Sequence, residues 1–278
     1  MLIQKFASQV LLFFLAALGV SASAWSTEPF QVGVCIHISK DNSAYAAIAP
    51  LLVSGRLSFR DDVFWGGIEP QKGALQYPPQ FHALEQLFDD AVAHGKSPLL
   101  VLAFGNKAYD NGDLPKSQAA LDGYARYVTF VVNYFKGRVS QFEVWNEWNG
   151  GMGGLSGTPQ TGASYVPLLK VAYKAIKAAN PAATVVGGVV SWTDQVWLDA
   201  FAKAGGLDYV DAFSVHPYVL NPYMIKPNFP VPKSPQDVHI SQSVANATGQ
   251  TTAADGIFIP IRGTPESAMQ NVDIFNIC

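Results

Sequence analysis

The segment Phe142–Gly151 (FEVWNEWNGG) decides the interpretation of the fold. It begins as an apolar, β-favouring run and stops abruptly at Asn146 and Glu147, before a glycine-rich loop. In a protein built from β-then-α units, this ending places a carboxylate at the C-terminal mouth of a parallel strand, where barrels keep their chemistry. Asn146 can hold a substrate hydroxyl there, and Trp145 and Trp148 offer flat apolar faces of the kind on which sugar rings stack.

Strand-like and helix-like runs alternate on both sides of this segment. Apolar runs cover 30–38, 56–64, 97–104, 139–147, 184–190 and 211–219, and amphipathic helical runs cover 79–95, 119–135, 163–179 and 197–204. Six such units imply parallel strands joined by right-handed crossovers. A doubly wound sheet would show the same local pattern, but the first strand-to-helix turn has no glycine-rich phosphate loop. The fold class predicted is therefore α/β, a (β/α)8 TIM-type barrel.

The alternation stops at residue 220. The segment that follows is rich in proline and then in small polar residues, and only Gly256–Ile261 (GIFIPI) is strand-like. Two more βα units of roughly 30 residues each would need helical stretches that 220–278 does not show. We therefore expect six units over 25–219 and an irregular tail over 220–278, as in a truncated or frame-altered barrel. Unpaired edges on the first and sixth strands would make such a chain unstable and prone to aggregation.

The first 24 residues have the pattern of a signal peptide. Lys5 is basic, Val10–Val20 (VLLFFLAALGV) is apolar, and Ala22-Ser23-Ala24 is a small-x-small cleavage site. The apolar core is too short to span a bilayer comfortably. The sequence predicts a secreted or periplasmic protein that begins at Trp25 and has no membrane partner after cleavage.

Composition and residue spacing argue against several other functions. Charged residues are 14% of the chain, the net charge is −3 and no basic block occurs, so nucleic acid is a poor partner. Cys35, Cys278 and the five histidines show neither a disulfide framework nor metal-ligand spacing, so we predict no metal and no cofactor. A Gly-x-Ser-x-Gly elbow is also absent from the sequence. The aromatic content of 12% suits carbohydrate binding.

The aromatic-Asn-Glu motif resembles the acid/base strand of retaining glycoside hydrolases with (β/α)8 barrels, the clan that contains families 5 and 39. The nearest similarity is to the family 39-like group that includes bacterial exopolysaccharide hydrolases, and it covers about residues 30–219. The resemblance implies cleavage of a polysaccharide or β-glycoside with two carboxyl groups. Glu147 would be the general acid/base, and Asn146 would bind the 2-hydroxyl of the sugar.

Further residues match this clan at other strand ends. The predicted substrate-binding residues, beside Asn146 and Trp148, are Arg60, Trp65, His216, Tyr218 and His37. For Arg60 an alternative stays open, which is a local ion pair with Asp61 or Asp62. Glu143 shares the strand parity of Glu147 and would need a cationic partner such as Arg60 if it is buried in the barrel. Glu69 is predicted to stabilise a loop.

The nucleophile of the clan is not recognisable in this sequence. It is a glutamate at the end of the seventh strand, and the one glutamate beyond Glu147 is Glu266. Its surroundings, Gly263–Ser267, are typical of a loop or a helix start, so we do not assign Glu266 this role. Two hypotheses follow, a glycosidase and a catalytically dead carbohydrate-binding barrel protein. The oligomeric state stays open.

Overall fold

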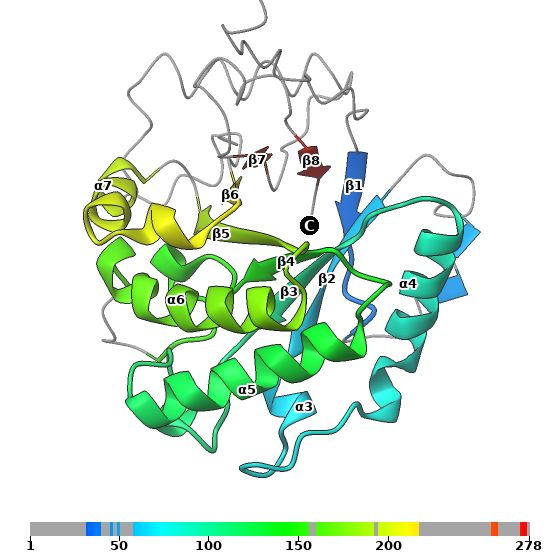
Figure 1. The fold of residues 1–278 in the computed structure, drawn as a ribbon, viewed down its shortest axis with the longest axis horizontal. Helices are drawn as coiled ribbons and strands as arrows, with labels where there is room; N and C mark the ends of the chain where they lie inside the picture. The colour runs from blue at the N-terminus through cyan, green and yellow to red at the C-terminus, as the bar shows by residue number, and fades with distance from the viewer. Residues whose placement is uncertain are drawn as a thin grey trace, which may run out of the picture.

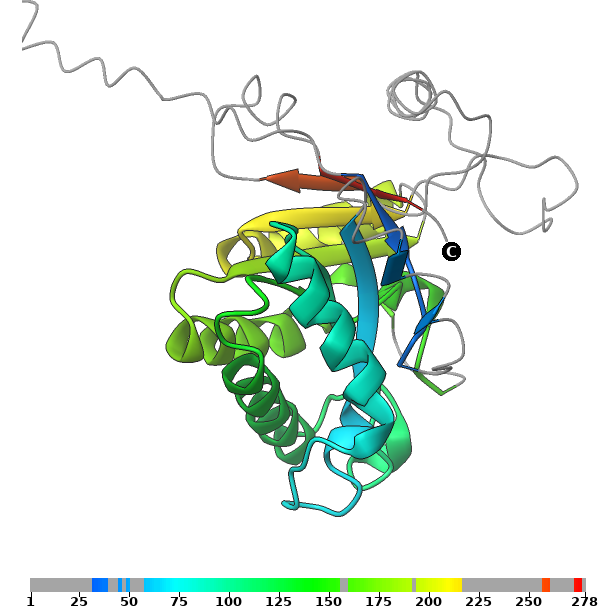
Figure 2. The same ribbon diagram turned by 90° about the vertical axis from the view of Figure 1, so that its right-hand side faces the viewer.

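The computed structural model describes residues 32–39, 45–46, 49–50, 58–155, 160–191 and 194–216, together with the strands Ile257–Pro260 and Asp273–Asn276. These segments form one curled sheet with helices packed on its outer face (Figures 1 and 2). The predicted signal peptide, Tyr218 and Glu266 lie outside the described residues. Within the described part of the chain, no helix combines the length and the apolar character needed to cross a bilayer.

Six parallel strands confirm the predicted fold class, a TIM-type barrel that is incomplete. Neighbouring strands pair in chain order, so each crossover leads to the adjacent position in the sheet. All six strands lie within the apolar runs of the sequence or extend them by one residue. They are β1 (Val32–Cys35), β2 (Ser58–Phe64), β3 (Leu99–Ala103), β4 (Gln141–Val144), β5 (Thr184–Ser191) and β6 (Ala212–His216).

Helices follow the strands from β2 to β5 and cover the outer face. They are α3 (Trp65–Ile68), α4 (His82–Ala93), α5 (Gln118–Tyr134), α6 (Gly162–Ala179) and α7 (Gln195–Lys203), with short 3-10 turns η2 (Pro79–Phe81), η3 (Asp110–Gly112), η4 (Trp148–Gly150) and η5 (Gly206–Tyr209). The last three long helices begin at side-chain caps, because Ser117, Thr161 and Asp194 each accept a hydrogen bond from a backbone N–H three residues on.

The two faces of the sheet bury different side chains, as the period of two along a strand requires. Outward residues such as Phe59 and Phe142 join the main core beneath the helices. On the other parity, Leu99, Val186 and Ala212 form a small separate apolar cluster inside the barrel. Because Arg60 and Glu143 share this inner parity, the barrel interior changes from apolar to charged towards the site.

Buried tyrosines of two helices donate hydrogen bonds to backbone carbonyls near the carboxyl ends of three strands. Tyr124 of α5 donates to the carbonyl of Leu102 at 2.6 Å, and Tyr165 of α6 donates to Val144 at 2.6 Å. Tyr127 donates to the carbonyl of Val63 in the same way. These bonds occupy carbonyls close to where the strand ladders end, and such a bond contributes about 0.5–1.5 kcal/mol. They hold the rim from which the functional side chains project.

The end of the chain closes the sheet, contrary to the expected open edges. Strand β7 (Ile257–Pro260) pairs antiparallel with β6, and β8 (Asp273–Asn276) pairs antiparallel with β7 and parallel with β1. The expectation of at most one short strand after residue 219 is therefore wrong, because Asp273–Asn276 adds a second. The reversed direction of β7 shows that these strands are not the missing parallel βα units; they cover the edges of β1 and β6 instead (Figure 1).

Candidate active site

A strained turn after β4 presents Glu147 at the barrel mouth. Trp145 has a φ of 74° and Glu147 a φ of 44°, so two side-chain-bearing residues within three positions adopt the left-handed region. Each such residue costs roughly 1–2 kcal/mol, so the turn persists only if surrounding contacts determine it. The Glu147 carbonyl accepts from the N–H of Gly150 at 3.0 Å, while the N–H of Trp145 donates to Leu102 of β3 at 3.1 Å.

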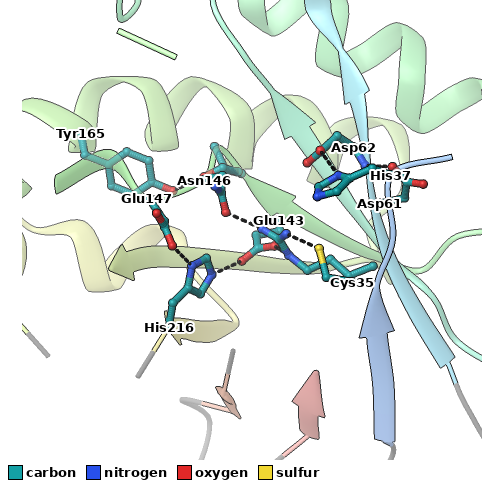
Figure 3. Close-up of polar contacts among 11 residues, drawn as sticks. Cys35, His37, Asp61, Asp62, Glu143, Asn146, Glu147, Tyr165 and His216 are labelled. Carbon is teal, nitrogen blue, oxygen red and sulfur yellow. Dashed lines mark hydrogen bonds and ion pairs between the residues drawn. The ribbon is translucent and has the colours of Figure 1, made fainter. Parts of the chain in front are cut away.

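His216 at the end of β6 joins two carboxylates. Its Nδ1 lies 2.8 Å from Oε1 of Glu147, and its Nε2 lies 3.9 Å from Oε1 of Glu143 (Figure 3). All three side chains are buried. Burial by itself lowers the pKa of the His216 imidazole, but hydrogen bonding to Glu143 and Glu147 outweighs burial and raises that pKa above its ordinary value. A protonated His216 donates a hydrogen bond to Glu147 and forms an ion pair with Glu143.

Arg60 of β2 occupies the other side of Glu143 and confirms the predicted pairing. Its Nε lies 2.5 Å from Oε2 of Glu143, within a buried ion pair. Burial alone raises the pKa of Glu143, but the charge of Arg60 and the contact with His216 lower it to about 2. The alternative in which Arg60 pairs only with Asp61 or Asp62 is wrong.

Arg60 also orients Asn146. Its Nη2 donates to Oδ1 of Asn146 at 2.7 Å. Because a guanidinium has donors and no acceptor, the oxygen of the carboxamide must face Arg60. The amide nitrogen of half-buried Asn146 then points elsewhere and is a ready donor for a ligand hydroxyl.

The β1 side of the mouth carries Cys35 and His37. Arg60 donates from Nη1 to the Cys35 sulfur at 3.5 Å. His37 is 43% exposed and its Nδ1 lies 3.4 Å from Oδ2 of Asp62. Asp61 faces the loop after β1, where it accepts from Ile38 N at 2.8 Å. His37 thus lies beside Asp62, separate from the contacts that join Glu143, His216 and Glu147 (Figure 3).

The predictions that Trp145 and Trp148 present stacking faces to a sugar and that Trp65 binds substrate are wrong. Trp65, Trp145 and Trp148 are at most 1% exposed. Trp65 stacks on Tyr109 at 4.8 Å, and Trp148 packs against Tyr165 at 5.3 Å. The physical reason is the left-handed turn, which folds Trp145 and Trp148 back into the core instead of extending the strand alternation.

The indole groups of these tryptophans are also bonded within the protein. Trp65 donates to Oε2 of Glu69 at 2.6 Å, and Trp148 donates to Ser164 at 3.1 Å. Glu69 additionally accepts from the N–H of Gly73 and from the hydroxyl of Tyr109, each at 2.6 Å. Glu69 is therefore a loop-stabilising residue, as predicted.

Two phenylalanines at the mouth were missed by the sequence interpretation. Phe64 ends β2 and Phe104 follows β3, both are partly exposed, and their rings lie 5.9 Å apart. Their position at the carboxyl ends of apolar runs was a usable signal, but phenylalanine in such a run is typical of core. They offer apolar ring surface in place of the buried tryptophans.

Comparison with solved structures identifies the fold. No protein-family model matches the chain, and no curated protein matches it in sequence. A family 39 glycoside hydrolase from the gut symbiont Bacteroides cellulosilyticus WH2 is similar with a TM-score of 0.58 and 29% identity, over 69% of this chain and 39% of that one. This chain has a glycoside hydrolase fold. The predicted similarity to family 39 is confirmed.

Two other structures share this fold. A monomeric beta-xylosidase from Caulobacter crescentus CB15 has a TM-score of 0.52 at 20% identity, over 81% of this chain and 50% of that one. A GH5_18 protein from Streptomyces cattleya in complex with Manb1-4GlcNAc has a TM-score of 0.52 at 15% identity, over 68% and 51%. At these identities the likeness concerns the fold alone. The chain spans between 39% and 51% of the length of these three proteins.

Proposed function

We propose that this chain binds a glycan at the mouth of its barrel and that Glu147 is the general acid/base for cleavage of a glycosidic bond. The observation that carries the proposal is the 2.8 Å contact between Glu147 and His216 at the carboxyl ends of β4 and β6. His216 is a titratable group within hydrogen-bond reach of Glu147 and can exchange a proton with it. Asn146, oriented by Arg60, supplies a donor for a sugar hydroxyl.

In the proposed reaction, Glu147 gives its proton to the leaving glycosidic oxygen as the bond to the anomeric carbon breaks. His216 holds the Glu147 carboxyl group through the contact at Oε1, and Glu147 regains its proton from the water that later releases the sugar. In a retaining mechanism, a second carboxylate about 5 Å from the acid attacks the anomeric carbon. Glu143 is unsuited to that role, because it is fully buried and ion-paired with Arg60.

The strand at the seventh position favours a second candidate function. Strand β7 has the sequence IFIP, carries no carboxylate and runs antiparallel to β6. The nucleophile of the resembling hydrolases is a glutamate at the end of a parallel seventh strand, which β7 does not reproduce. The alternative is a barrel that binds carbohydrate without cleaving it.

The two candidates are separated by one binding and cleavage experiment. The purified chain is titrated calorimetrically with a panel of β-linked oligosaccharides, and the same mixtures are analysed for reducing ends. Binding with cleavage establishes the glycosidase, and binding without cleavage establishes the carbohydrate-binding protein. Neither binding nor cleavage across β-glucans, β-mannans, β-xylans and bacterial exopolysaccharides would contradict the proposal.

We further propose that the protein is exported to the periplasm or the medium and acts there on a polysaccharide. The basis is the signal-peptide pattern of Lys5, Val10–Val20 and Ala22–Ala24. Mass spectrometry of the protein recovered outside the cytoplasm should find Trp25 as its first residue. Recovery with Met1 still attached would contradict export by cleavage.

A further inference from the structure

The turn that carries Glu147 needs an anchor on the side of β5 and β6. Its internal bonds, from Gly150 and Met152 to the Glu147 carbonyl, shape the turn without placing it relative to those strands. On the β3 side, the N–H of Trp145 bonds to Leu102. The side chain of Asn149, within η4, supplies the contact on the opposite side.

Asn149 bonds to both backbone polar groups of Ser191, the last residue of β5. Its Nδ2 donates to the Ser191 carbonyl at 2.8 Å, and its Oδ1 accepts from the Ser191 N–H at 2.8 Å. Because a backbone N–H only donates, this pair of bonds fixes which carboxamide atom is oxygen. Regular pairing between β4 and β5 covers Gln141 to Glu143 of β4. The Asn149 carboxamide therefore makes the two bonds of a peptide group to the last residue of β5, beyond the end of the β4–β5 ladder.

Ser191 in turn pairs with His216 across the β5–β6 ladder. The contacts make a closed ring that runs from Glu147 through the turn to Asn149, on to Ser191 and His216, and back to Glu147. Strand β5 is irregular just before Ser191, since Gly188 and Val189 have φ values of 89° and 49° and the register shifts there. After this shift, Ser191 is held on the β6 side by its pairing with His216 and on the β4 side by the bonds from Asn149.

We propose that Asn149 is a positioning residue that holds Glu147 against His216 by clamping the turn after β4 to the end of β5. Asn149 acts through Glu147 and does not itself take part in bond cleavage. The inference rests on the proposed function only for its effect on a rate. Its geometric part, the distance between Glu147 and His216, is independent of any activity.

The test compares three variants by NMR titration of the His216 imidazole, which is assigned with His216→Asn. Within the part of the chain that the structure describes, Glu143, Glu147 and Arg60 are the charged groups that act on this imidazole. Glu147→Gln removes one carboxylate and should lower the pKa of His216. The value measured in this variant is the reference for His216 without the Glu147 charge. Asn149→Ala should shift the pKa of His216 from the wild-type value towards this lowered value. A pKa of His216 that is unchanged in Asn149→Ala would overturn the proposal.

Asn106→Ala is the matched control. Asn106 is buried, and its carboxamide bonds through both atoms, to the Glu69 carbonyl at 2.8 Å and from the Ala108 N–H at 2.9 Å, in the loop after β3. Asn149 makes one further, longer contact, from Nδ2 to Oδ2 of Asp194 at 3.4 Å. Asn106→Ala should lose stability as Asn149→Ala does and leave the pKa of His216 unchanged; an equal shift in both variants would show a merely structural effect and overturn the proposal. Should Asn149→Ala not fold, Asn149→Ser replaces it, because the shorter neutral side chain cannot reproduce both bonds to Ser191 and adds no charge; a shift of the His216 pKa towards the lowered value is again expected.

Kinetics add a second readout if the chain cleaves glycosides. Misplacing the acid by about 1 Å should lower kcat roughly 10- to 100-fold in Asn149→Ala, with KM little changed because Asn149 does not contact the substrate. A loss confined to KM would contradict the positioning role. If wild type has no activity, the proposed reaction fails, and the His216 titration still decides the role of Asn149.

Discussion

The charged side chains at the barrel mouth follow one another with alternating sign. Arg60 lies between Asn146 and Glu143, and His216 lies between Glu143 and Glu147. Buried charges are tolerated only when each has a partner of opposite sign. This arrangement keeps Glu143 ionised and makes it a support for the two cations, which leaves Glu147 as the carboxylate at the end of this series.

The first prediction concerns the ion pair at the centre of this series. Glu143→Gln leaves the Arg60 guanidinium buried without its counter-charge and should destabilise the fold by about 3–5 kcal/mol, measured by urea unfolding. The double variant Arg60→Met with Glu143→Leu replaces the pair by apolar side chains and should recover much of that loss. If the single variant costs no more than Asp122→Asn, the substitution of an exposed acid, the pair does not have the stabilising role described.

The second prediction follows from the pKa of two residues. The pKa of Glu143, lowered from 4.5 to about 2, adds stability above pH 4.5 that is lost as pH falls towards 2. The raised pKa of His216 adds stability below 6.5 that is lost as pH rises through its folded value. The difference in unfolding free energy between wild type and His216→Asn should therefore shrink as pH rises above 6.5. A difference independent of pH would contradict the assignment.

The comparison of wild type with His216→Asn also cancels the titration of a second buried group, Asp61. Burial raises the pKa of Asp61 to about 7, against the hydrogen bond from Ser39 that lowers it. Asp61 therefore titrates within the pH window of this comparison. Because Asp61 is present in both proteins, its contribution cancels in the difference.

At the scale of secondary-structure elements, tyrosines on the helices fix the ends of the strands at the barrel mouth by hydrogen bonding to strand carbonyls. Tyr165→Phe removes the hydroxyl that bonds to Val144, directly before the strained turn. The expected cost is about 1–3 kcal/mol, because the carbonyl is left buried without this donor. Tyr173→Phe on the same helix is the control, since Tyr173 is partly exposed and contributes ring contacts such as that with Tyr209 at 6.0 Å. Equal stability of the two variants in chemical unfolding would show that the hydroxyl bond contributes nothing.

The positions of strands and helices were predictable from sequence where the hydrophobic periodicity is strong. Side-chain directions were not predictable at positions where the backbone departs from regular strand or helix geometry. The runs at 97–104 and 184–190 became β3 and β5 within about two residues, because buried strands are nearly continuous apolar runs. The same logic correctly paired Glu143 with Arg60. It failed at Trp145 and Trp148, because no residue pattern announces a left-handed turn at Glu147. Asn149 was missed for the same reason.

The whole molecule depends on its last two strands to cover the sheet edges. Antiparallel pairing of β7 with β6 and parallel pairing of β8 with β1 occupy backbone groups that six strands alone would leave open. Sequence reasoning missed β8 because a strand of four residues carries little pattern, and pairing with a distant edge is decided by the sheet and not locally.

A proline substitution tests this closure. Phe258 pairs with Ser214 of β6, and Phe258→Pro removes an N–H and fixes φ within a four-residue strand. We expect lower resistance to urea together with concentration-dependent aggregation, measured by light scattering, because the edge of β6 becomes available to other chains. Unchanged solubility and stability would show that β7 is not needed to close the sheet.

The most direct test of the central claim is the rate at which the chain cleaves an alkyl β-glycoside in the presence of sodium azide. Azide can attack the anomeric carbon in place of a missing carboxylate and form the glycosyl azide, while the poor alkoxide leaving group still requires a proton from Glu147. We predict that wild type forms this product, or the free sugar if the chain supplies its own nucleophile. Glu147→Gln should be slower by a factor of about 10² to 10⁴, and Glu85→Gln should match wild type. Equal rates for wild type and Glu147→Gln would contradict the role of Glu147 as the acid.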